Sequence, residues 1–397
     1  MRLAHLSLEN FRNYVRLEID LPAGVGVLVG GNAQGKTNLL EAVYYLATTK
    51  SFRATSDREI INWLATEQSP SYARLAGRCE RARGAAEVEI AVRLDRPAAG
   101  DAAPAVAKRI RINKTAKRAI DLIGQVNVVM FTPQDIDIVS GAPLLRRRFL
   151  DMTIAQVDGE YCRTLAHYNK VLLQRNHLLR QIRDRRARPD QLEFWDEEMV
   201  KAGSLLTLRR RRAVVELDEL AEDYHRRLTG TGERLRMIYR PSVDLSPHLD
   251  GVVDLMADPS ATVGRAFADH LHRSRAREVA QGMSLLGPHR DDLLFLIDEA
   301  SVNAYGSRGQ QRTVSLSLKL AESSFLHEHA GEKPILLLDD VLSELDEPRR
   351  HFVVEAIKNG QQVLVTGTDL RAFPRRFLAE ATVFGVNNGT ISRSSEY

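Results

Sequence analysis

One glycine-rich stretch of eight residues constrains this chain more than any other part of its sequence. It follows a short apolar run (25–29) and precedes apolar residues at helical spacing, so a strand, a loop and a helix are predicted in that order. The stretch reads Gly30-Gly31-Asn32-Ala33-Gln34-Gly35-Lys36-Thr37. This is the pattern of a P-loop, in which backbone amides surround phosphate groups. It predicts an α/β fold that binds a nucleoside triphosphate, with Lys36 on the outer phosphates and Thr37 on a magnesium ion.

A second motif lies near the other end of the chain. Residues 335–340 are four apolar residues followed by two aspartates, Asp339 and Asp340. A solvated strand end is the simpler interpretation of such a run alone. Beside a P-loop, the pattern is typical of a strand that brings Asp339 to magnesium, directly or through water. Asp340 would then lie next to the attacking water as a general base or as a group that positions it.

A third segment, residues 305–312, reads Tyr-Gly-Ser-Arg-Gly-Gln-Gln-Arg and precedes a helix that is expected to begin near Thr313. Ser307 and the neighbouring amides are placed to cap that helix and to offer donors to an anion. Taken alone, the segment is a loop with a helix cap. Its place before the apolar strand matches the signature motif of ABC-type ATPases.

The remaining sequence separates into three parts by pattern. Residues 1–143 are rich in alternating strands, including a hairpin of 109–112 and 117–120 across Asn113-Lys114, with a loop at 97–104. Residues 144–283 carry long helical patterns rich in Leu and Arg, with a break near Arg188-Pro189 that indicates a helical hairpin. Strands at 293–297, 335–338 and 362–366 and a helix at 313–321 follow. We therefore expect an ATPase domain in two parts, 1–143 and 284–397, around a helical insertion at 144–283.

Composition excludes several classes of protein. No apolar run approaches the roughly 20 residues that cross a bilayer, and the first residues lack the pattern of a signal peptide. The two cysteines, Cys79 and Cys162, are far apart and lack the spacing of a zinc site. A cytoplasmic protein without a membrane partner is expected. The net charge is only +4, but residues 163–212 hold 13 Lys and Arg against 6 Asp and Glu, a local surface that attracts polyanions.

Five elements occur in the order of the ABC-type ATPases. They are the P-loop, a Q-loop candidate at Gln134, the segment with Ser307, the strand ending at Asp339, and a D-loop that ends at Asp346. A switch position would follow at Thr368-Asp369. The separation of P-loop and signature is too large for a compact transporter ATPase and too small for a protein with a long coiled coil.

More specifically, the chain resembles the RecF family of bacterial recombination-mediator ATPases. The matching segments span nearly the whole chain in one order. They are residues 8–14 (Leu-Glu-Asn-Phe-Arg-Asn-Tyr), 35–42 (Gly-Lys-Thr-Asn-Leu-Leu-Glu-Ala), 50–53 (Lys-Ser-Phe-Arg), 146–151 (Arg-Arg-Arg-Phe-Leu-Asp), 287–292 (Gly-Pro-His-Arg-Asp-Asp) and 307–312 (Ser-Arg-Gly-Gln-Gln-Arg).

The resemblance implies an ATP-dependent homodimer. Two chains would close head to tail around two ATP molecules, so that Ser307 of one chain touches the γ-phosphate held by the P-loop of the other. Gln134 would serve catalysis and magnesium beside Asp340 and Asp339, and Asp346 would lie in the nucleotide site. The cofactors are then ATP and Mg²⁺. Asp340 is one methylene shorter than the Glu of many ABC ATPases, so slow, DNA-dependent hydrolysis is expected.

The resemblance also implies partners. The chain would bind duplex DNA near single-strand gaps, with RecR as a protein partner, and assist RecA loading in the RecO/RecA pathway of DNA repair, replication and the SOS response. Our candidates for DNA contacts are Arg209, Arg210, Arg211 and Arg212. The alternative is that these arginines form a solvated helix face or pair with Glu193, Glu197 and Glu198.

Three other functions compete with this interpretation. An OLD-type ATPase-nuclease, or another P-loop DNA-repair ATPase, would need a further acidic metal-binding domain, for which no segment of adequate length remains. A transporter ATPase subunit would need an insertion that docks on transmembrane helices, and the block at 144–283 is too large and too basic. A DNA-binding module with a vestigial nucleotide site is disfavoured because Lys36, Thr37, Asp339 and Ser307 are all intact.

Overall fold

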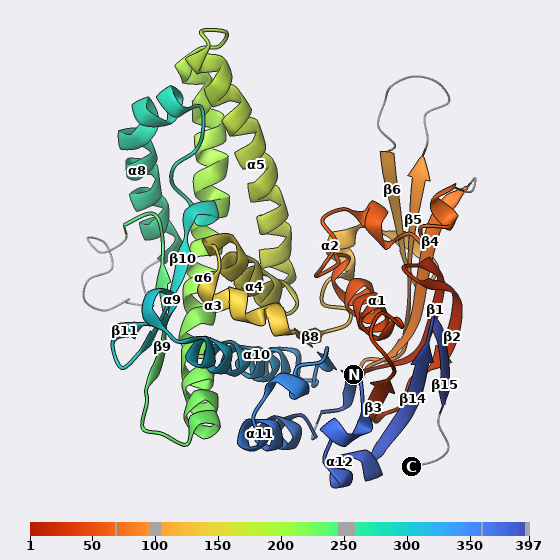
Figure 1. Ribbon diagram of the computed structural model, residues 1–397. Coiled ribbons are helices and arrows are strands. Elements are labelled where there is room, and N and C mark those ends of the chain that lie inside the picture. Colours follow the sequence, from red (N-terminus) through yellow and green to blue (C-terminus); the bar gives the residue numbers. More distant parts are fainter. Residues whose placement is uncertain (68–69, 96–104, 245–258, 359, 394–397) are drawn as a thin grey trace. The chain divides into compact units, whose positions relative to one another are not determined.

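Segments from both ends of the chain fold together (Figure 1). The computed structural model describes residues 1–67, 70–95, 105–244, 259–358 and 360–393. Unit 1 comprises Met1–Asp135 and Lys319–Tyr397, and unit 2 comprises Ile136–Leu318. The predicted domain limits at 143/144 and 283/284 differ from the limits of these units and stay a prediction. The predicted loop at 97–104 lies outside the described residues.

A six-stranded, mostly parallel sheet organises unit 1, in the order β15-β14-β3-β13-β12-β8. Only β15 runs antiparallel to its neighbour. The buried strands β8, β12 and β13 are nearly continuous in apolar residues, as parallel strands covered on both faces require. The strands of this sheet are β3 (Gly24–Val29), β8 (Val128–Phe131), β12 (Ile335–Leu338), β13 (Gln362–Gly367), β14 (Ala381–Asn387) and β15 (Thr390–Arg393).

A second, antiparallel sheet of unit 1 has the order β2-β1-β4-β5-β6-β7. Its strands are β1 (Arg2–Phe11), β2 (Tyr14–Asp20), β4 (Ser71–Glu80), β5 (Ala86–Asp95), β6 (Ala105–Ile112) and β7 (Thr115–Lys117). Alternate residues of β4 and β5 are buried, so one face of this sheet supplies core side chains. One cluster joins both sheets to α1 (Lys36–Thr48) and includes Leu8, Leu40, Leu75 and Leu337. This packing fixes the helix that begins within the P-loop.

Two predicted elements of unit 1 need correction. The hairpin across Asn113-Lys114 exists, but its second strand is β7, and residues 119–122 form the short helix α2 (Ala119–Leu122). Asp121 accepts a 3.2 Å bond from the amide of Arg118 and starts that helix, which ends the strand early. The strands β14 and β15 were not predicted. The other helices of unit 1 are α11 (Glu347–Lys358) and α12 (Arg375–Ala379).

Unit 2 is built on the predicted helical hairpin. Its long arms are α5 (Gly159–Arg183) and α6 (Leu192–Thr229), and α8 (Pro259–Gln281) packs on both. Arg175, fully buried, explains part of the unusual arginine content of these helices. It bonds to Asp196 at 2.7 Å and to Glu278 at 2.7 Å, and so ties α5 to α6 and α8. The shorter helices of the unit are α3 (Ile136–Ser140), α4 (Pro143–Ala155) and α9 (Val302–Tyr305).

A small three-stranded sheet completes unit 2, in the order β11-β10-β9. Its strands are β9 (Leu235–Arg240), β10 (Asp292–Ile297) and β11 (Ala300–Ser301). The strand predicted at 293–297 is therefore real, but it pairs with β9 and does not join the sheet that carries the P-loop. Helix α10 (Arg308–Ala330) begins in unit 2 and ends in unit 1. It starts five residues before the predicted start at Thr313 and continues well beyond 321.

Candidate functional site

The functional residues of unit 1 gather because four parallel strands end at one edge of a sheet. The P-loop follows β3, Thr132–Gln134 follow β8, Asp339 and Asp340 follow β12, and Thr366 lies at the end of β13. Ligands of open α/β sheets bind outside the carboxyl ends of the strands. The fold therefore assembles a site from segments more than 300 residues apart.

The backbone of the P-loop requires its glycines. Gly35 has φ +117°, a conformation that favours glycine, and it lies directly before α1. A Cβ on Gly30 would lie 2.2 Å from the carbonyl oxygen of Val386, so the loop leaves no space for a side chain there. Gly31, Asn32 and Ala33 are exposed at the top of the loop. The loop thus presents backbone amides at the start of a helix, as phosphate binding requires.

Lys36 extends back across the loop. Its Nζ donates to the carbonyl oxygens of Gly30 at 2.6 Å and of Gly31 at 2.7 Å. Burial lowers the pKa of the Lys36 ammonium group, whereas the charges of Asp340 and Asp339 act in the opposite direction. This cation therefore lies within the electrostatic field of both aspartates that follow β12.

Two hairpin turns support the loop from behind. Asn13, in the turn between β1 and β2, donates from Nδ2 to the carbonyl oxygen of Gln34 at 3.0 Å, and the Tyr14 hydroxyl donates to that of Gly35 at 3.0 Å. In the turn between β14 and β15, the amide of Gly389 donates to the same Gln34 carbonyl at 3.0 Å. These contacts preorganise the loop, because each fixes a peptide group that would otherwise rotate.

The helix that follows the P-loop is anchored by a buried carboxylate. Glu41 on α1 is fully buried and pairs with Arg12, whose Nη2 lies 2.6 Å from Oε1. The Ser51 hydroxyl also donates to Glu41. A buried charge is tolerated only where it is paired and hydrogen-bonded, as here. Arg12 and Ser51 belong to the segments that carry the family resemblance, and the structure assigns them to the support of α1.

Thr37 and Asp339 meet at the centre of the site. The Thr37 hydroxyl donates to Oδ1 of Asp339 at 2.8 Å, and the Thr366 hydroxyl lies 3.0 Å from the same oxygen. Desolvation raises the pKa of Asp339, and the two threonine hydrogen bonds and the charge of Arg53 limit this rise. The hydroxyl oxygen of Thr37 and a carboxylate oxygen of Asp339 thus lie side by side.

These residues fit a magnesium ion. Mg²⁺ takes oxygen ligands and usually binds through one or two protein groups, with water and phosphate oxygens completing the octahedron. A hydroxyl and a carboxylate match that donor set. Among the described residues there is no group of three or more His, Cys, Asp or Glu that could hold a metal ion alone.

Asp340 has an uncommon backbone conformation. Its φ is +52°, in the left-handed region that residues with a side chain rarely adopt. The backbone amide of Asp340 donates a 2.9 Å hydrogen bond to the Thr366 hydroxyl, and this bond holds the conformation. Such outliers occur mainly at functional sites. Asp340 is partly exposed, so its carboxylate is accessible to a water molecule.

Gln134 follows β8 in a short turn, Pro133–Asp135, and is exposed. Its neighbour Asp135 fixes the turn, because its Oδ2 accepts from the Thr132 amide at 2.7 Å and its Oδ1 accepts from the Thr132 hydroxyl at 3.2 Å. Burial raises the pKa of Asp135 to about 6, and the charge of Lys319 on α10 limits the rise. Because β8 borders β12, Gln134 lies at the same sheet edge as Asp339. Its catalytic role stays a prediction.

Ser307 and Asp346 both begin helices. Ser307, in unit 2, accepts from the Gln310 amide at 3.2 Å, and its own amide donates to Oε1 of Gln310 at 3.0 Å. The predicted cap of α10 is therefore confirmed. Asp346, in unit 1, accepts from the Arg349 amide at 3.1 Å at the start of α11. Both side chains are exposed, and their roles toward nucleotide stay predictions.

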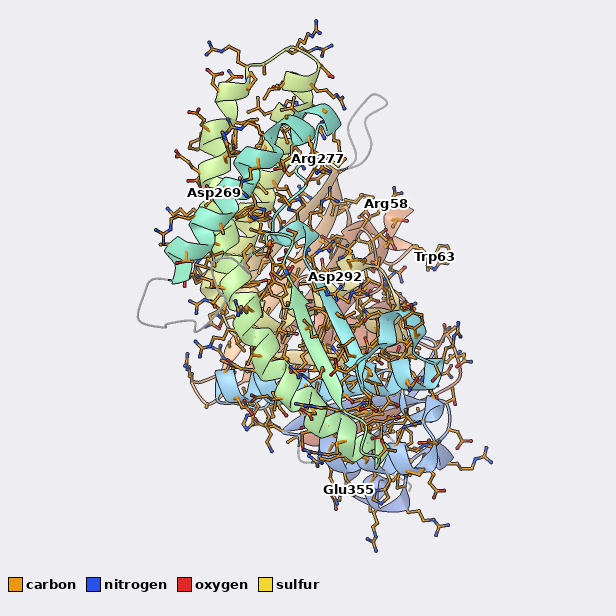
Figure 2. The ribbon with its side chains drawn as sticks, turned by 90° about the vertical axis from the view of Figure 1, so that its left-hand side faces the viewer. Arg58, Trp63, Asp269, Arg277, Asp292 and Glu355 are labelled. Carbon is orange, nitrogen blue, oxygen red and sulfur yellow. The ribbon has the colours of Figure 1, made fainter. Side chains whose placement is uncertain are left out.

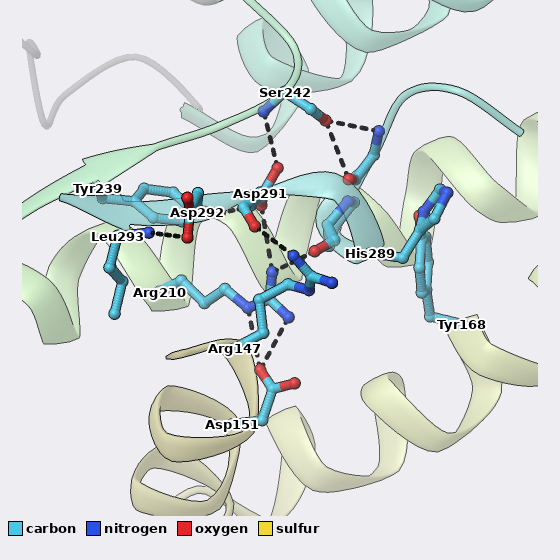
Figure 3. Close-up of polar contacts among 12 residues, drawn as sticks. Arg147, Asp151, Tyr168, Arg210, Tyr239, Ser242, His289, Asp291, Asp292 and Leu293 are labelled. Atoms are coloured by element: carbon cyan, nitrogen blue, oxygen red, sulfur yellow. Dashed lines mark hydrogen bonds and ion pairs between the residues drawn. The ribbon is translucent and has the colours of Figure 1, made fainter. Parts of the chain in front are cut away.

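The prediction that Arg210 contacts DNA is wrong. Arg210 is 1% exposed and lies in a polar cluster of unit 2, which we call the Arg210 cluster (Figure 3). Its Nη2 lies 2.8 Å from Asp151 on α4, and its Nη1 lies 3.2 Å from Asp291, next to β10. Asp291 also accepts from the Tyr239 hydroxyl and the Ser242 amide. A side chain buried among these partners cannot reach a phosphate group.

The neighbours of Arg210 differ from it in exposure. Arg209 pairs with Asp158 at 3.3 Å and with Glu160 at 3.1 Å, and Arg212 pairs with Glu216 at 3.2 Å. Arg211 is exposed. The pairing partners predicted as an alternative, at positions 193, 197 and 198, are therefore not those found for these arginines. DNA contacts by Arg209, Arg211 and Arg212 stay predictions.

Several supporting residues were missed from sequence. Thr366 bonds to both aspartates of the site, and its signal was a single hydroxyl after the apolar run Val363–Val365. Asn13 and Tyr14 were noted only as part of a family-like segment. Their partners are P-loop carbonyl groups, which sequence spacing alone does not reveal.

Comparison with known proteins gives one consistent family. A model of the RecF/RecN/SMC N terminal domain matches residues 2–390. The DNA replication and repair protein RecF of Herpetosiphon aurantiacus is 46% identical over 398 residues, which cover 98% of this chain and 99% of that protein. RecF of Geobacillus thermodenitrificans is 36% identical over 397 residues and covers 100% of both chains.

Solved structures agree with the sequences. The recombination mediator protein RecF with ATP, described as part of the RecFOR pathway, is similar with a TM-score of 0.84 and 28% identity, over 99% of this chain and 97% of that one. An Smc head bound to the C-winged helix domain of ScpA has a TM-score of 0.52 over 99% of this chain and 97% of that one, and at 15% identity it shows the fold alone. The predicted fold class, an α/β ATPase head with a β-rich N-terminal part and a helical insertion, is confirmed.

Proposed function

The chain belongs to the RecF family within the RecF/RecN/SMC proteins, and from this we propose that it is an ATP-dependent recombination mediator of the RecFOR pathway in DNA replication and repair. It binds ATP, hydrolyses it slowly, and binds DNA as a dimer that ATP closes. Among the described residues no helix is long and apolar enough to cross a membrane. We place its action in the cytoplasm, where its DNA substrate lies.

The hydrogen bond between Thr37 and Asp339 carries the nucleotide part of the proposal. It joins the P-loop to the end of β12 at the edge where four strands finish. A chance match to the P-loop pattern would not bring a carboxylate at an apolar strand end to within 2.8 Å of the loop's threonine. A solvated strand end, the alternative for Asp339, is disfavoured because this carboxylate is only partly exposed and one of its oxygens contacts two threonine hydroxyls.

Thr37 and Asp339 are the residues that hold Mg²⁺, with Gln134 as a further candidate. When bound, the ion neutralises charge on the phosphate oxygens. Lys36 supplies a positive charge to the outer phosphates, and the amides of residues 31–36 orient them. Asp340 accepts a hydrogen bond from the attacking water and so directs its lone pair. The Thr366 hydroxyl holds Asp340 and Asp339 in a fixed relation through its two contacts.

Slow turnover follows from the length of Asp340. An aspartate reaches one methylene less far than the glutamate that we expect at this position in faster relatives, so its contact with water is less well formed. A slow ATPase remains in its ATP-bound state long enough to act as a switch. We expect DNA to accelerate hydrolysis.

Ser307 supplies the contact that couples ATP binding to dimerisation. It is exposed at the N-terminus of α10, where unpaired amides and the helix dipole favour an anion. Ser307 of one chain would meet the γ-phosphate held by the P-loop of a second chain, with Asp346 near the same site. ATP then binds the closed dimer more tightly than the open chain, and the equilibrium shifts accordingly.

The DNA and protein partners follow from the family. The proposed substrate is duplex DNA adjacent to a single-strand gap, and RecR is the proposed protein partner in the assistance of RecA loading with RecO. Contacts from arginines to phosphates would give affinity without base specificity and with strong salt dependence.

Light scattering after size exclusion tests the proposal as a whole. The native chain and Lys36→Ala are measured with ATP, with ADP and without nucleotide, each with and without gapped duplex DNA. The native chain doubles its mass with ATP only, and Lys36→Ala stays monomeric. A native chain that remains monomeric with ATP and DNA contradicts the clamp, whereas a dimer that forms without nucleotide contradicts its control by ATP.

A further inference from the structure

The turn of the α5–α6 hairpin is strongly basic. Residues 180–188 contain five arginines and a single aspartate, and all five arginines are exposed. Arg277, near the end of α8, is exposed as well. Figure 2 labels Arg277 and shows nitrogen-tipped side chains around this end of the hairpin. We call the following residues the tip arginines: Arg180, Arg183, Arg185, Arg186, Arg188 and Arg277.

Packing gathers the tip arginines at one end of unit 2. Leu179, Ile182 and Leu192 form a small apolar cluster across the hairpin, and Val279 of α8 packs against it. Gly282, just after α8, lies against α5, because a Cβ there would be 3.0 Å from both Cγ of Arg180 and Nη1 of Arg183. The backbone that carries the tip arginines is therefore held by packing against α6 and α8.

The charges of the tip arginines are poorly neutralised within unit 2. Arg183 pairs with Asp184 at 3.1 Å and Arg188 pairs with Asp190 at 3.1 Å, in ion pairs open to solvent. Such pairs contribute little, so a phosphate group can replace the carboxylate. Within the described part of the chain, no carboxylate lies within ion-pair distance of Arg180, Arg185, Arg186 or Arg277. The buried Arg175 and Arg210, in contrast, have two carboxylate partners each.

The residue types at the tip favour duplex DNA over a protein partner or single-stranded DNA. A protein partner would need an apolar or aromatic centre in the interface, and residues 183–190 offer only Ala187 and Pro189. Single-stranded DNA is held by aromatic side chains that stack on bases, but no Phe, Tyr or Trp occurs between Tyr168 and Phe194. Phe194, in the first turn of α6, is 60% exposed and packs edge-on against Trp195, so single-stranded DNA would have this one aromatic pair beyond the tip itself. Duplex DNA needs neither an apolar centre nor stacking aromatic side chains, because contacts between its phosphates and arginines are sufficient for binding without base specificity.

We propose that the tip arginines bind the phosphates of duplex DNA, without base specificity, at a contact separate from the nucleotide site. The proposal rests on DNA binding by this chain, which belongs to the proposed function. The tip lies about 27 Å along α6 from Arg210, at a rise of about 1.5 Å per residue. Since the tip arginines do not take part in ATP binding, the contact forms with and without nucleotide.

A pair of matched variants tests this contact. Arg185→Gln/Arg186→Gln removes two charges at the tip, and Arg226→Gln/Arg227→Gln removes two charges at the other end of the same hairpin, where the side chains are 63% and 52% exposed. Binding to a labelled duplex and to single-stranded DNA of equal length is measured over a range of salt concentrations, with and without ATP. Urea unfolding of each variant verifies its fold.

We expect the tip variant to bind duplex DNA on the order of tenfold more weakly at low salt, with a salt slope reduced by about 2, since each lost phosphate contact removes about 0.9. The control variant stays within about twofold of the native chain. Unchanged duplex affinity and slope in the tip variant overturns the proposal, as does an equal loss in both variants or a loss confined to single-stranded DNA.

The same samples separate this proposal from the proposed function. ATP-driven dimerisation, followed by light scattering, is expected to be unchanged in the tip variant. A native chain that does not bind DNA, or does not dimerise with ATP, contradicts the proposed function. A native chain that does both, together with a tip variant that binds duplex DNA equally well, contradicts the tip contact alone.

Discussion

The hydroxyl of Thr37 donates a 2.8 Å hydrogen bond to the carboxylate of Asp339, across 302 positions of sequence. Thr37 lies in the first turn of α1, after the loop that follows β3, and Asp339 directly follows β12. In the sheet, β13 separates β3 from β12. Thr366 at the end of β13 contacts the same carboxylate oxygen. Residues carried by three neighbouring strands and the segments that follow them thus meet at one oxygen atom. The nucleotide and metal chemistry that we propose for the chain depends on this arrangement.

Loss of the Lys36 charge weakens ATP binding. A hydrogen bond to a charged group contributes about 1.5–3 kcal/mol, so Lys36→Ala is expected to raise the Kd for ATP roughly 10- to 150-fold. The effect arises at the phosphates, so adenosine binding should not change. Titration calorimetry measures both constants. Thr37→Ser, which keeps the hydroxyl that meets Asp339, is the control and should bind ATP almost normally.

Asp340→Asn separates hydrolysis from binding. The amide cannot accept a proton from water, and general-base groups contribute roughly 10²- to 10⁴-fold, so kcat should fall at least about 100-fold. ATP affinity and ATP-driven dimerisation should persist, because Lys36, Thr37 and Asp339 are intact. Single-turnover hydrolysis and light scattering on the same sample test this separation. Hydrolysis at the native rate would remove Asp340 from the reaction.

The motifs that meet at this edge of the sheet could be found from sequence because each of them obeys local rules. A glycine loop between a strand and a helix, and an apolar run ending in two aspartates, are visible without any tertiary information. Asn13, Thr366 and the turn at Gly389 were missed because their partners are backbone carbonyls or a carboxylate far away in the chain. No fixed sequence spacing connects such supporting residues to their partners, so a motif search does not find them.

Protonation of Asp135 should make the stability of the chain depend on pH. Burial raises the pKa of this carboxyl group from near 3.8 to about 6, with Lys319, Glu322 and Thr132 as its other influences. The folded chain therefore binds the proton more tightly than the unfolded chain, and this contribution to stability is lost as pH rises from about 4 to about 6. Asp135→Asn removes that part of the pH dependence.

Urea midpoints across this pH range, compared for the native chain and Asp135→Asn, measure the effect. Asp137→Asn, which changes an exposed carboxylate two residues away, is the control and should follow the native profile. An Asp135→Asn profile parallel to that of the native chain would show that the Asp135 carboxyl group does not titrate in this window.

Arg210 should act on stability and not on DNA affinity. Arg210→Met leaves Asp151 and Asp291 without their buried cation, a loss that costs about 3–5 kcal/mol in other proteins. Arg211→Met, at the exposed neighbour, should change the free energy of unfolding by less than about 0.5 kcal/mol. Urea unfolding measures the effect of each variant on stability, and the salt dependence of DNA binding measures its effect on phosphate contacts. A stable Arg210→Met chain with a smaller salt slope would restore Arg210 as a DNA contact.

The arginine-rich helices show where sequence prediction reaches its limit. Helical periodicity correctly gave the hairpin of α5 and α6, but it did not distinguish Arg210, 1% exposed, from Arg211 beside it. That distinction depends on Asp291 and Tyr239, which reach Arg210 only after β9 and β10 have paired. The start of α10 was placed late for a related reason, since Ser307 caps it through Gln310.

Mixing two inactive chains tests the composite site most directly. Lys36→Ala lacks a working P-loop and Ser307→Arg lacks a working signature, so neither chain should dimerise with ATP alone. Each is labelled with one member of a fluorescence energy-transfer pair. A mixed dimer contains one intact site, formed by the P-loop of the Ser307→Arg chain and Ser307 of the Lys36→Ala chain. We predict energy transfer on addition of ATP, and none with ADP. If the native chain dimerises with ATP but the mixture gives no transfer, Ser307 does not act across the dimer.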